Sequence, residues 1–451
     1  METTPSFFER LRAWSRRSVT LKLLSIGILI LLMLIPTGMI SSLIRERRTL
    51  RDESLTEVSS KWGYAQTIAG PVISVPYIVR SLNDKGKTEY ETRFAHFLPE
   101  SLTVKGNMLP EKRYRGIYVV VLYNAKLQIS GTFSSLNLRP LGIPVEDYRF
   151  DEAFVSVGIS DMKGINGKIN VHWNDSVYSL NPGIVTHDVF NSGASAQLTV
   201  SDKQQISFSY ELDLNGSTSL RFAPFGKETS VNIQSAWGSP SFEGYTLPQQ
   251  RTVNDTGFAA TWSMTQLNRN YPQQGTGKFI NVESGGDGYS NDQNDGYASF
   301  GVRLMLPVDE YQKTERSVKY CIMFIVITFI TFFFVETMGK RRIHPIQYLL
   351  VGFAICLFYV LLLSISEQLN FDKAYMIGCV ATLGLISYYA AHVFNNRKLS
   401  LIFSGMLALL YGFFYSLLQL EDYALLLGSI GLFIILGTIM YLTRKINWYE
   451  E

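Results

Sequence analysis

The sequence predicts a membrane protein of mixed class: an α-helical bundle of six transmembrane helices with a large inserted extracytoplasmic domain that is all-β and sandwich-like. Three observations predict this fold. Six apolar runs lie towards the ends of the 451-residue chain, one near the amino terminus and five in the last third. Residues 45–317 between them are largely polar and alternate in the manner of strands. The composition, 47% hydrophobic and 18% charged, is the average of two unlike parts.

The first apolar run, residues 21–44, is long enough to cross a membrane, because about 20 helical residues span a hydrocarbon core of about 30 Å. It is too long for the apolar core of an ordinary signal peptide, and no small-residue cleavage site follows it. We therefore expect a retained signal anchor preceded by a cytoplasmic segment, residues 1–20. A cleaved signal peptide is the disfavoured alternative.

The predicted β-rich domain, residues 45–317, starts with a helical stalk, because residues 45–61 have mixed charges and neither Gly nor Pro. The clearest strand is 206–214, which alternates strictly between apolar and polar residues. Asn215-Gly216 follows it and alternation resumes in 217–222, a pattern that predicts a hairpin. Further strands are expected at 72–79, 93–98, 115–122, 125–133, 154–159, 231–235, 258–262 and 300–306.

This domain contains no cysteine, since Cys321, Cys356 and Cys379 all fall inside predicted spans. A domain exposed to an oxidising space without disulfides must be stabilised by its own core, and a domain of this length is large enough for that.

Five more spans form the predicted bundle, residues 318–443, followed by a cytoplasmic end, residues 444–451. Each run is long enough to cross the bilayer as a helix. The expected spans are 318–338, 346–366, 374–394, 399–420 and 423–443.

The short loops predict the orientation, because cytoplasmic loops are enriched in Lys and Arg. Basic residues follow the second, fourth and sixth spans, whereas the alternate loops are mainly acidic. Both termini are therefore expected in the cytoplasm. Four arginines after the first span argue weakly against this, but acidic residues interleave with them and long exported domains translocate largely regardless of charge. The residues concerned are Lys340, Arg341, Arg342, Arg397, Lys398, Arg444 and Lys445 inside, Glu367, Asp372, Glu421 and Asp422 outside, and Arg45, Arg47, Arg48 and Arg51 as the exceptions.

No motif for metal hydrolysis, acyl transfer, nucleotide binding or dithiol chemistry occurs in the sequence. We therefore assign no catalytic, cofactor-binding or metal-binding residue, and expect neither enzyme activity nor a cofactor. The net charge of +3 does not indicate nucleic-acid binding. The histidines are scattered, and we interpret His344 as a capping or interfacial residue and His392 as an interfacial one. The others are His96, His172 and His187.

Two features of the exported domain have competing interpretations. Residues 285–296 are rich in oxygen ligands, but their spacing does not fit a calcium loop and a polar loop is favoured. Trp237, Pro240 and Phe242 are interpreted as core residues rather than as an exposed binding patch.

Charged and small residues near the spans have mainly structural interpretations. Glu336 is expected to pair with Lys340 at the membrane edge. The outer carboxylates Glu367, Asp372, Glu421 and Asp422 are interpreted as solvated, with cation collection or docking of basic residues of the exported domain as the alternative. Small residues of the last three spans predict close helix packing, within the chain or between copies. They are Gly378, Gly384, Gly405, Gly412, Gly428, Gly431, Gly437, Ala390 and Ala391.

A series of short motifs resembles one family of bacterial inner membrane proteins, the CreD family. In the second half these are 311–314, 319–320, 336–337, 342–352, 358–359, 361–364 and 366–367, and in the exported half 70–73, 96–102 and 237–242, with 442–449 at the end. Because these motifs occur in the same order along the chain as in the family, the whole series is more specific than any single motif. The resemblance implies a cell-envelope integrity protein of the inner membrane, with a periplasmic domain, controlled by a two-component system and connected with envelope stress and antibiotic response. It implies no catalytic residue.

Three hypotheses for function remain. The first is a non-enzymatic envelope protein whose β-domain binds an envelope protein or cell-wall component while the bundle anchors it in the lipid bilayer, as a monomer or as a homo-oligomer. The second is a transporter or channel for an envelope-active compound, which requires a polar path through the bundle. The third is a sensor that passes a signal inward. The predicted inner loops argue against it, because they are too short to form a cytoplasmic output domain. The polar span residues are Tyr359, Tyr388, Tyr389, Tyr411, Tyr415, Ser364 and Ser404.

Overall fold

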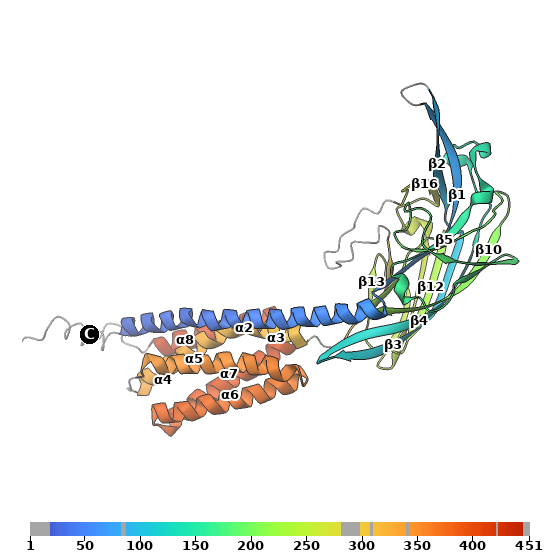
Figure 1. Cartoon of the computed structure of the whole chain (residues 1–451). Helices are drawn as coiled ribbons and strands as arrows, with labels where there is room; N and C mark the ends of the chain where they lie inside the picture. The colour runs from blue at the N-terminus through green and yellow to red at the C-terminus, as the bar shows by residue number, and fades with distance from the viewer. Residues whose placement is uncertain are drawn as a thin grey trace, which may run out of the picture. The chain divides into compact units, whose positions relative to one another are not determined.

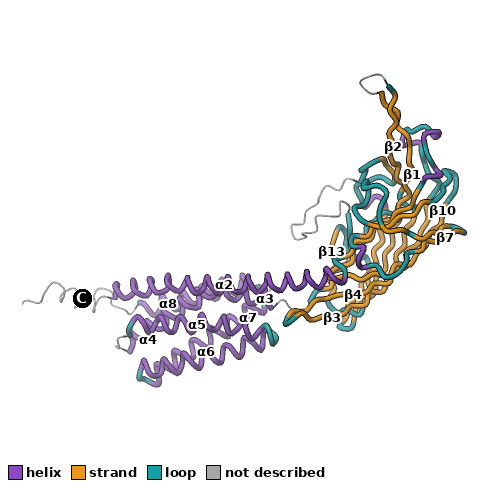
Figure 2. Tube along the Cα trace, in the orientation of Figure 1, coloured by secondary structure: helices purple, strands orange, loops and turns teal. Residues whose placement is uncertain are grey.

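The computed structural model describes residues 19–82, 87–280, 298–306, 310–339, 343–420 and 423–444. The chain forms two compact units, one comprising Met1–Arg51 with Val308–Glu451 and the other Asp52–Pro307. The first unit is helical and the second consists mainly of strands (Figures 1 and 2).

The long helices account for most of the first unit. α2 continues through Pro36 and past residue 44, and its last residues, from Asp52 on, belong to the second unit. The bounds are α2 Val19–Trp62, α3 Glu310–Lys319, α4 Cys321–Gly339, α5 Pro345–Ser366, α6 Phe371–Phe394, α7 Arg397–Gln419 and α8 Ala424–Thr443.

Within the described residues, four helices are long and apolar enough to cross a membrane, namely α2, α5, α6 and α7. A fifth candidate arises if α3 and α4, which meet at a bend of 42°, form one span. The apolar stretch of α8, Leu425–Tyr441, is shorter. The predicted set of apolar helices is thus confirmed as four or five candidate spans, whereas the number six stays a prediction.

Local capping explains where several of these helices begin. Pro345 is the first residue of α5, a position where its missing N–H costs no hydrogen bond. His344 precedes it and its Nδ1 accepts a hydrogen bond from the Ile346 N–H at 3.3 Å, so the predicted capping role is confirmed. Asn396 caps α7 in the same way, accepting from the N–H groups of Lys398 and Leu399.

Aromatic rings fill the interior between α4, α5 and α7. The Phe324 ring lies 4.7 Å from Tyr411 and 4.3 Å from Phe414, and Phe358 lies 5.0 Å from Tyr411. These are the distances at which tilted and edge-to-face rings attract each other.

Only some of the small residues predicted to pack closely do so within the chain. A Cβ on Gly378 would lie 3.3 Å from the Phe358 ring, one on Gly428 3.4 Å from Leu417, and one on Gly431 would collide with Phe413. Ala390 is buried and Ala391 is exposed. Across the described residues, nothing lies within 4 Å of such a Cβ on Gly384, Gly405, Gly412 or Gly437, so the prediction is wrong for these within one chain.

Two sheets form the second unit, and the predicted large all-β region is confirmed. Sheet A has nine strands within the described ranges; seven follow the order β13-β17-β11-β1-β5-β9-β8, β2 pairs with β1, and β16 pairs with β2. The bounds are β1 Gln66–Leu82, β2 Thr88–Phe97, β5 Phe154–Ile159, β8 Asn181–Pro182, β9 Gly193–Gln197, β11 Ser219–Phe222, β13 Pro240–Gly244, β16 Gln274–Thr276 and β17 Phe300–Leu304.

Sheet B has eight strands in the described part of the chain, in the order β14-β15-β12-β3-β4-β10-β6-β7. Figure 2 shows its long strands in orange. The bounds are β3 Ser101–Arg115, β4 Tyr118–Phe133, β6 Asn170–Trp173, β7 Ser176–Ser179, β10 Ile206–Ser217, β12 Glu228–Ser235, β14 Gln250–Asn254 and β15 Gly257–Thr265.

One apolar core joins the two sheets. Ile73 and Phe300 of sheet A belong to the same buried cluster as Val104, Leu212 and Trp262 of sheet B. Strict alternation in β10 and β15 places one face of sheet B in this core and leaves the other face polar.

The hairpin predicted at Asn215-Gly216 is wrong. β10 continues through both residues and pairs with β4 as far as Ser217 opposite Leu122, whereas β11 pairs with β1 and β17 in the other sheet. The chain changes sheets at Thr218, whose φ of 62° lies in the left-handed region. Gly216 is required for a different reason, because the Tyr123 ring occupies the space of a Cβ there.

The strand predicted over 115–122 is also wrong at its start. β3 ends at Arg115, Gly116 turns the chain with a φ of 60°, and β4 begins at Tyr118. A positive φ favours glycine, so the turn falls inside a run whose apolar residues resemble one strand.

The end of α2 packs on this β3–β4 hairpin. Trp62 donates its indole N–H to the carbonyl oxygen of Tyr123 at 3.2 Å, and Arg113 lies over the Trp62 ring. Arg115 pairs with Glu57 at 3.1 Å. The last turns of the helix are thereby attached to the sheet.

Candidate functional site

The outer face of sheet B is hollowed. The hollow has a volume of about 840 Å³ and lies over β3, β4, β10, β12 and β15. Most of the residues that line it are polar, since every second residue of these strands points away from the core.

Strand register arranges the polar side chains of this face in rows that run across the strands. One row, the amide row, contains Thr261, Asn232, Lys105, Gln128 and Glu211, each directly opposite the next. A second row contains Gln234, Asn107, Lys126 and Asp213. Neighbouring strands lie about 4.8 Å apart, so each row repeats at that spacing.

A third row on the same face carries only hydroxyl groups. Ser263, Ser230, Thr103, Ser130 and Ser209 oppose one another in order across the same five strands. It neighbours the amide row, because residues two apart on a strand share a face. The three rows together form a regular polar surface, which we call the polar face.

Two lysines on the polar face have no acidic partner among the described residues. In the amide row, Asn232 donates to Thr261 at 2.9 Å and Gln128 donates to Glu211 at 3.4 Å, which leaves Lys105 between them. Lys126 lies opposite Asp213, but the Asp213 Oδ1 already accepts hydrogen bonds from Asn124 at 2.6 Å and Asn166 at 3.0 Å. Two ammonium groups are therefore available for a ligand.

A buried serine, histidine and aspartate come together elsewhere in the β unit, a cluster that the sequence did not predict. The His96 Nδ1 lies 2.8 Å from the Ser74 hydroxyl, and its Nε2 lies 3.1 Å from Asp188. His96 is fully buried and Ser74 nearly so, so a substrate has no access to the serine hydroxyl. The cluster therefore joins β1, β2 and the segment before β9. The other four histidines are exposed.

Protonation of His96 is expected to make the β unit less stable in mild acid. Burial lowers the pKa of His96, although the hydrogen bond that its ring donates to Asp188 opposes the shift. Below about pH 6.5, the usual histidine pKa, the unfolded chain therefore takes up this proton more readily than the folded chain, and stability falls as the pH falls. Hydrogen exchange of β2 in the full chain at pH 7.5 and pH 5.5 measures the effect. His96→Gln should reduce the pH dependence and His172→Gln, at an exposed position, should leave it unchanged; an unchanged pH dependence in His96→Gln contradicts the assignment.

Glu336 is the buried acidic side chain of the helical unit within the described residues. It accepts hydrogen bonds from the Tyr348 hydroxyl at 2.8 Å and the Ile343 N–H at 2.7 Å, and pairs with Lys22 of α2. The expected partner, Lys340, lies outside the described residues. The carboxylate thus connects α2, α4 and the start of α5.

Arginines that follow the first span have partners in the helical unit. Arg47 lies 3.9 Å from Glu367, Arg48 pairs with Glu315 at 3.3 Å, and Arg51 lies over the Tyr311 ring. The Tyr311 hydroxyl also donates to Glu367 at 3.0 Å. Glu367 therefore docks a basic residue, one of the two alternatives for the outer carboxylates.

The other outer carboxylates do not extend this arrangement. Asp372 accepts a hydrogen bond from the side-chain amide of Gln419, and Glu421 and Asp422 lie outside the described residues. The described residues contain no group of three or more His, Cys, Asp or Glu side chains suited to a metal ion. The oxygen-rich loop at 285–296 also lies outside the described residues.

Trp237 and Phe242 are core residues, as predicted. The Trp237 indole N–H donates to the carbonyl oxygens of Ser239 and Met305, and its ring is 8% exposed. Phe242 packs edge-to-face on Phe258 and Trp262. Pro240 is half-buried in β13. The alternative of an exposed aromatic patch is not supported.

Of the polar span residues proposed for a transport path, Tyr359 and Tyr411 lie close together, since both pack on Phe324 and Phe358. Tyr359 and Tyr411 are buried among aromatic rings, Ser364 and Tyr388 are exposed, and the remaining ones are half-buried. The remaining ones are Tyr389, Tyr415 and Ser404.

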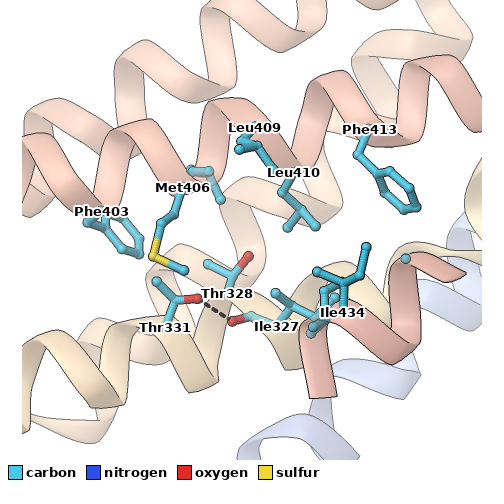
Figure 3. Close-up of a pocket in the computed structure, with 12 residues that line it drawn as sticks. Ile327, Thr328, Thr331, Phe403, Met406, Leu409, Leu410, Phe413 and Ile434 are labelled. Atoms are coloured by element: carbon cyan, nitrogen blue, oxygen red, sulfur yellow. Dashed lines mark hydrogen bonds between the residues drawn. The ribbon is translucent and has the colours of Figure 1, made fainter. Parts of the chain in front are cut away.

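An apolar cavity of about 240 Å³ lies instead between α4, α7 and α8 (Figure 3). Its walls are aliphatic and aromatic, apart from the hydroxyl groups of Thr328 and Thr331 on α4. Such a cavity suits an apolar molecule rather than an ion.

Comparison with known proteins agrees with these features. The family model described as "Inner membrane protein CreD" matches residues 18–449. Inner membrane protein CreD of Escherichia coli (strain K12) is 32% identical over 426 residues, which are 93% of this chain and 91% of that protein. The resemblance predicted from the motifs is confirmed.

Proposed function

This chain belongs to the CreD family of inner membrane proteins, and from that premise we propose that it supports the cell envelope by binding a hydrophilic cell-wall polymer with the polar face of sheet B. It acts by binding rather than by catalysis. The bundle anchors the β unit in the inner membrane, and the β unit lies in the periplasm.

The distribution of charge supports this orientation. Lys and Arg follow alternate predicted spans, as they do on the cytoplasmic side of membrane proteins, which supports six spans with both termini in the cytoplasm. The arginines after the first span are the exception, and Arg47, Arg48 and Arg51 each have a partner in the helical unit. Long exported domains, such as the one that follows these arginines, translocate largely regardless of charge.

The observation that carries the proposal is the set of cross-strand rows. Hydroxyl and amide groups repeat across five strands, and two lysines with no acidic partner among the described residues stand among them. A polymer whose hydroxyl, amide and carboxylate groups also repeat can make the same contact several times. Weak single contacts then add to a useful affinity.

The composition of the polar face favours a polymer over a folded protein. The centres of protein interfaces are enriched in Tyr, Trp, Phe, Met and Arg. The three rows contain none of these residues. A transport function is not supported by the bundle, since Tyr359 and Tyr411 are enclosed by aromatic rings and its described cavity is apolar.

Reversing both lysine charges tests the proposal. The double variant Lys105→Glu with Lys126→Glu should bind purified peptidoglycan at least about a hundredfold more weakly, because each charge-assisted hydrogen bond contributes about 1.5–3 kcal/mol. Binding is measured by sedimentation of full-length protein in detergent with insoluble peptidoglycan. The same variant should fail to restore envelope-stress resistance to a deletion strain.

The matched control is Lys168→Glu with Lys203→Glu, which makes the same change of net charge at exposed lysines outside the hollow. It should bind and complement like the unmodified chain. Failure of the unmodified chain to sediment with peptidoglycan, or equal behaviour of the two double variants, would reject the polar face as the binding surface.

A further inference from the structure

The wall of the cavity between α4, α7 and α8 contains a buried polar group that has no hydrogen-bond partner within the described residues. Thr328 of α4 is 1% exposed, and its hydroxyl has no hydrogen-bond partner in the described structure. Figure 3 shows Thr328 in the space between α4 and α7, below Leu409 and Leu410. A buried hydroxyl without a partner is unfavourable, so its presence in an otherwise apolar cavity calls for an explanation.

A neighbouring threonine makes the hydrogen bond that a threonine hydroxyl in a helix usually makes. Thr331, one turn along α4, donates to the Ile327 carbonyl oxygen at 2.8 Å, the back-bond that Ser and Thr commonly make within helices. Both threonines line the cavity, and only Thr328 lacks such a bond within the described residues. Its hydroxyl is therefore an unused donor in the cavity wall, which a molecule in the cavity reaches when the side chains that cover it shift.

We propose that this cavity binds a bilayer-dissolved apolar molecule that carries one hydrogen-bond acceptor, such as a carbonyl or ether oxygen, which Thr328 contacts. The apolar walls bury the body of the ligand, and the threonine hydroxyl orients it. This is the usual composition of small-molecule sites.

The depth of Thr328 distinguishes this ligand from an ordinary glycerolipid. α4 runs from Cys321 to Gly339, so Thr328 lies about 10 Å from one end of the helix and about 16 Å from the other. The ester and headgroup oxygens of glycerolipids stay near the membrane surface, whereas their acyl chains have no acceptor. A molecule that dissolves in the hydrocarbon interior brings its oxygen to this depth.

The cavity is accessible from the membrane rather than from water. Leu409 of α7 and Ile434 of α8 line it and are 75% and 61% exposed, so the gap between these helices opens outward. In a bilayer that exterior is hydrocarbon. An apolar ligand can enter sideways without crossing a polar barrier.

Benzophenone is a suitable probe, because it is apolar, has one carbonyl acceptor and on irradiation forms a bond to nearby C–H groups. Full-length protein in lipid nanodiscs is irradiated with benzophenone, and the labelled peptides are mapped by mass spectrometry. We expect labelling at Met406 and Leu410 on the cavity wall. Competition is measured against a tritiated benzophenone tracer. Diphenylmethane, which has a similar shape but no acceptor, should reduce labelling by the tracer less than non-tritiated benzophenone does.

Two pairs of variants test the two parts of the proposal. Thr328→Val should weaken labelling about two- to tenfold, the range for loss of one neutral hydrogen bond, whereas Thr331→Val should not. Gly431→Leu should abolish labelling, since a side chain at this position of the cavity wall collides with the Phe413 ring, whereas Gly437→Leu has open space and should have no effect.

Labelling spread over the outer surfaces of all helices, unchanged by Gly431→Leu, would overturn the site. Equal labelling of Thr328→Val and the unmodified chain, with equal competition by diphenylmethane, would overturn the acceptor-bearing ligand. Neither outcome depends on whether the polar face of sheet B binds the cell wall.

Discussion

Replacing Glu336 by alanine is expected to destabilise the helical unit by about 3 kcal/mol, the sum of two buried hydrogen-bonding groups left without a partner. The Tyr348 hydroxyl and the Ile343 N–H both donate to this carboxylate. Lys22 also loses its contact with Glu336, but its side chain is 31% exposed and can turn towards the surface. The effect is large because Glu336 itself is only 3% exposed.

The thermal midpoint of the full chain in detergent, followed by size-exclusion retention after heating, measures this loss. A change of about 3 kcal/mol corresponds to roughly 6–12 °C for a unit of this size. Glu336→Gln keeps one acceptor oxygen, so its thermal midpoint should lie between those of the unmodified chain and Glu336→Ala. The control is Glu315→Ala, whose single ion pair with Arg48 is partly exposed and should contribute less than about 1 kcal/mol. Equal shifts in Glu336→Ala and Glu315→Ala would contradict a structural role of the buried carboxylate.

Replacing Trp262 by alanine is expected to weaken the β unit by about 3–5 kcal/mol, the usual cost of removing a fully buried Trp. Trp262 lies on β15 of sheet B, and its ring packs on Phe242 and Phe300 of sheet A, at 5.8 Å and 5.7 Å between ring centroids. The substitution therefore opens a cavity between the two sheets. The strands on both sides should lose protection together.

Hydrogen exchange of β15 and β17 in the full chain measures that loss of protection. Trp262→Phe should cost much less, because an aromatic ring remains and the removed indole N–H has no partner in the described structure. Thr261→Ala, the adjacent residue on the outer face, should change stability by no more than about 1 kcal/mol. If Trp262→Ala affects only β15, the ring does not couple the sheets.

Hydropathy predicted the helices well because a span is a local property. About 20 consecutive apolar residues are sufficient evidence, and α5 begins and ends within one residue of its predicted range. Capping is local too, which is why the role of His344 was predicted from the Pro that follows it. The number of spans depends less on local sequence, because α3 and α4 meet at a bend that no local residue pattern predicts.

Strand prediction was correct for β5 and for the strictly alternating part of β10, and failed where the partner strand decided the outcome. Asn215-Gly216 satisfies the local rule for a tight turn, yet the ladder with β4 continues through it. The reason is tertiary, because Tyr123 needs the space beside Gly216 and β11 finds its partners in the other sheet.

The sequence by itself determined the division into apolar helices and a disulfide-free β unit, the membership of the CreD family and the absence of known catalytic motifs. These depend on composition, segment length and local patterns. Only the tertiary structure decided which polar side chains lie together: the rows of the polar face, the contacts of Glu336 with Lys22 and Tyr348, and the Ser74–His96–Asp188 cluster. In each case the partners are brought together by strand register or helix packing over long sequence separations, and those depend on how the whole core is filled.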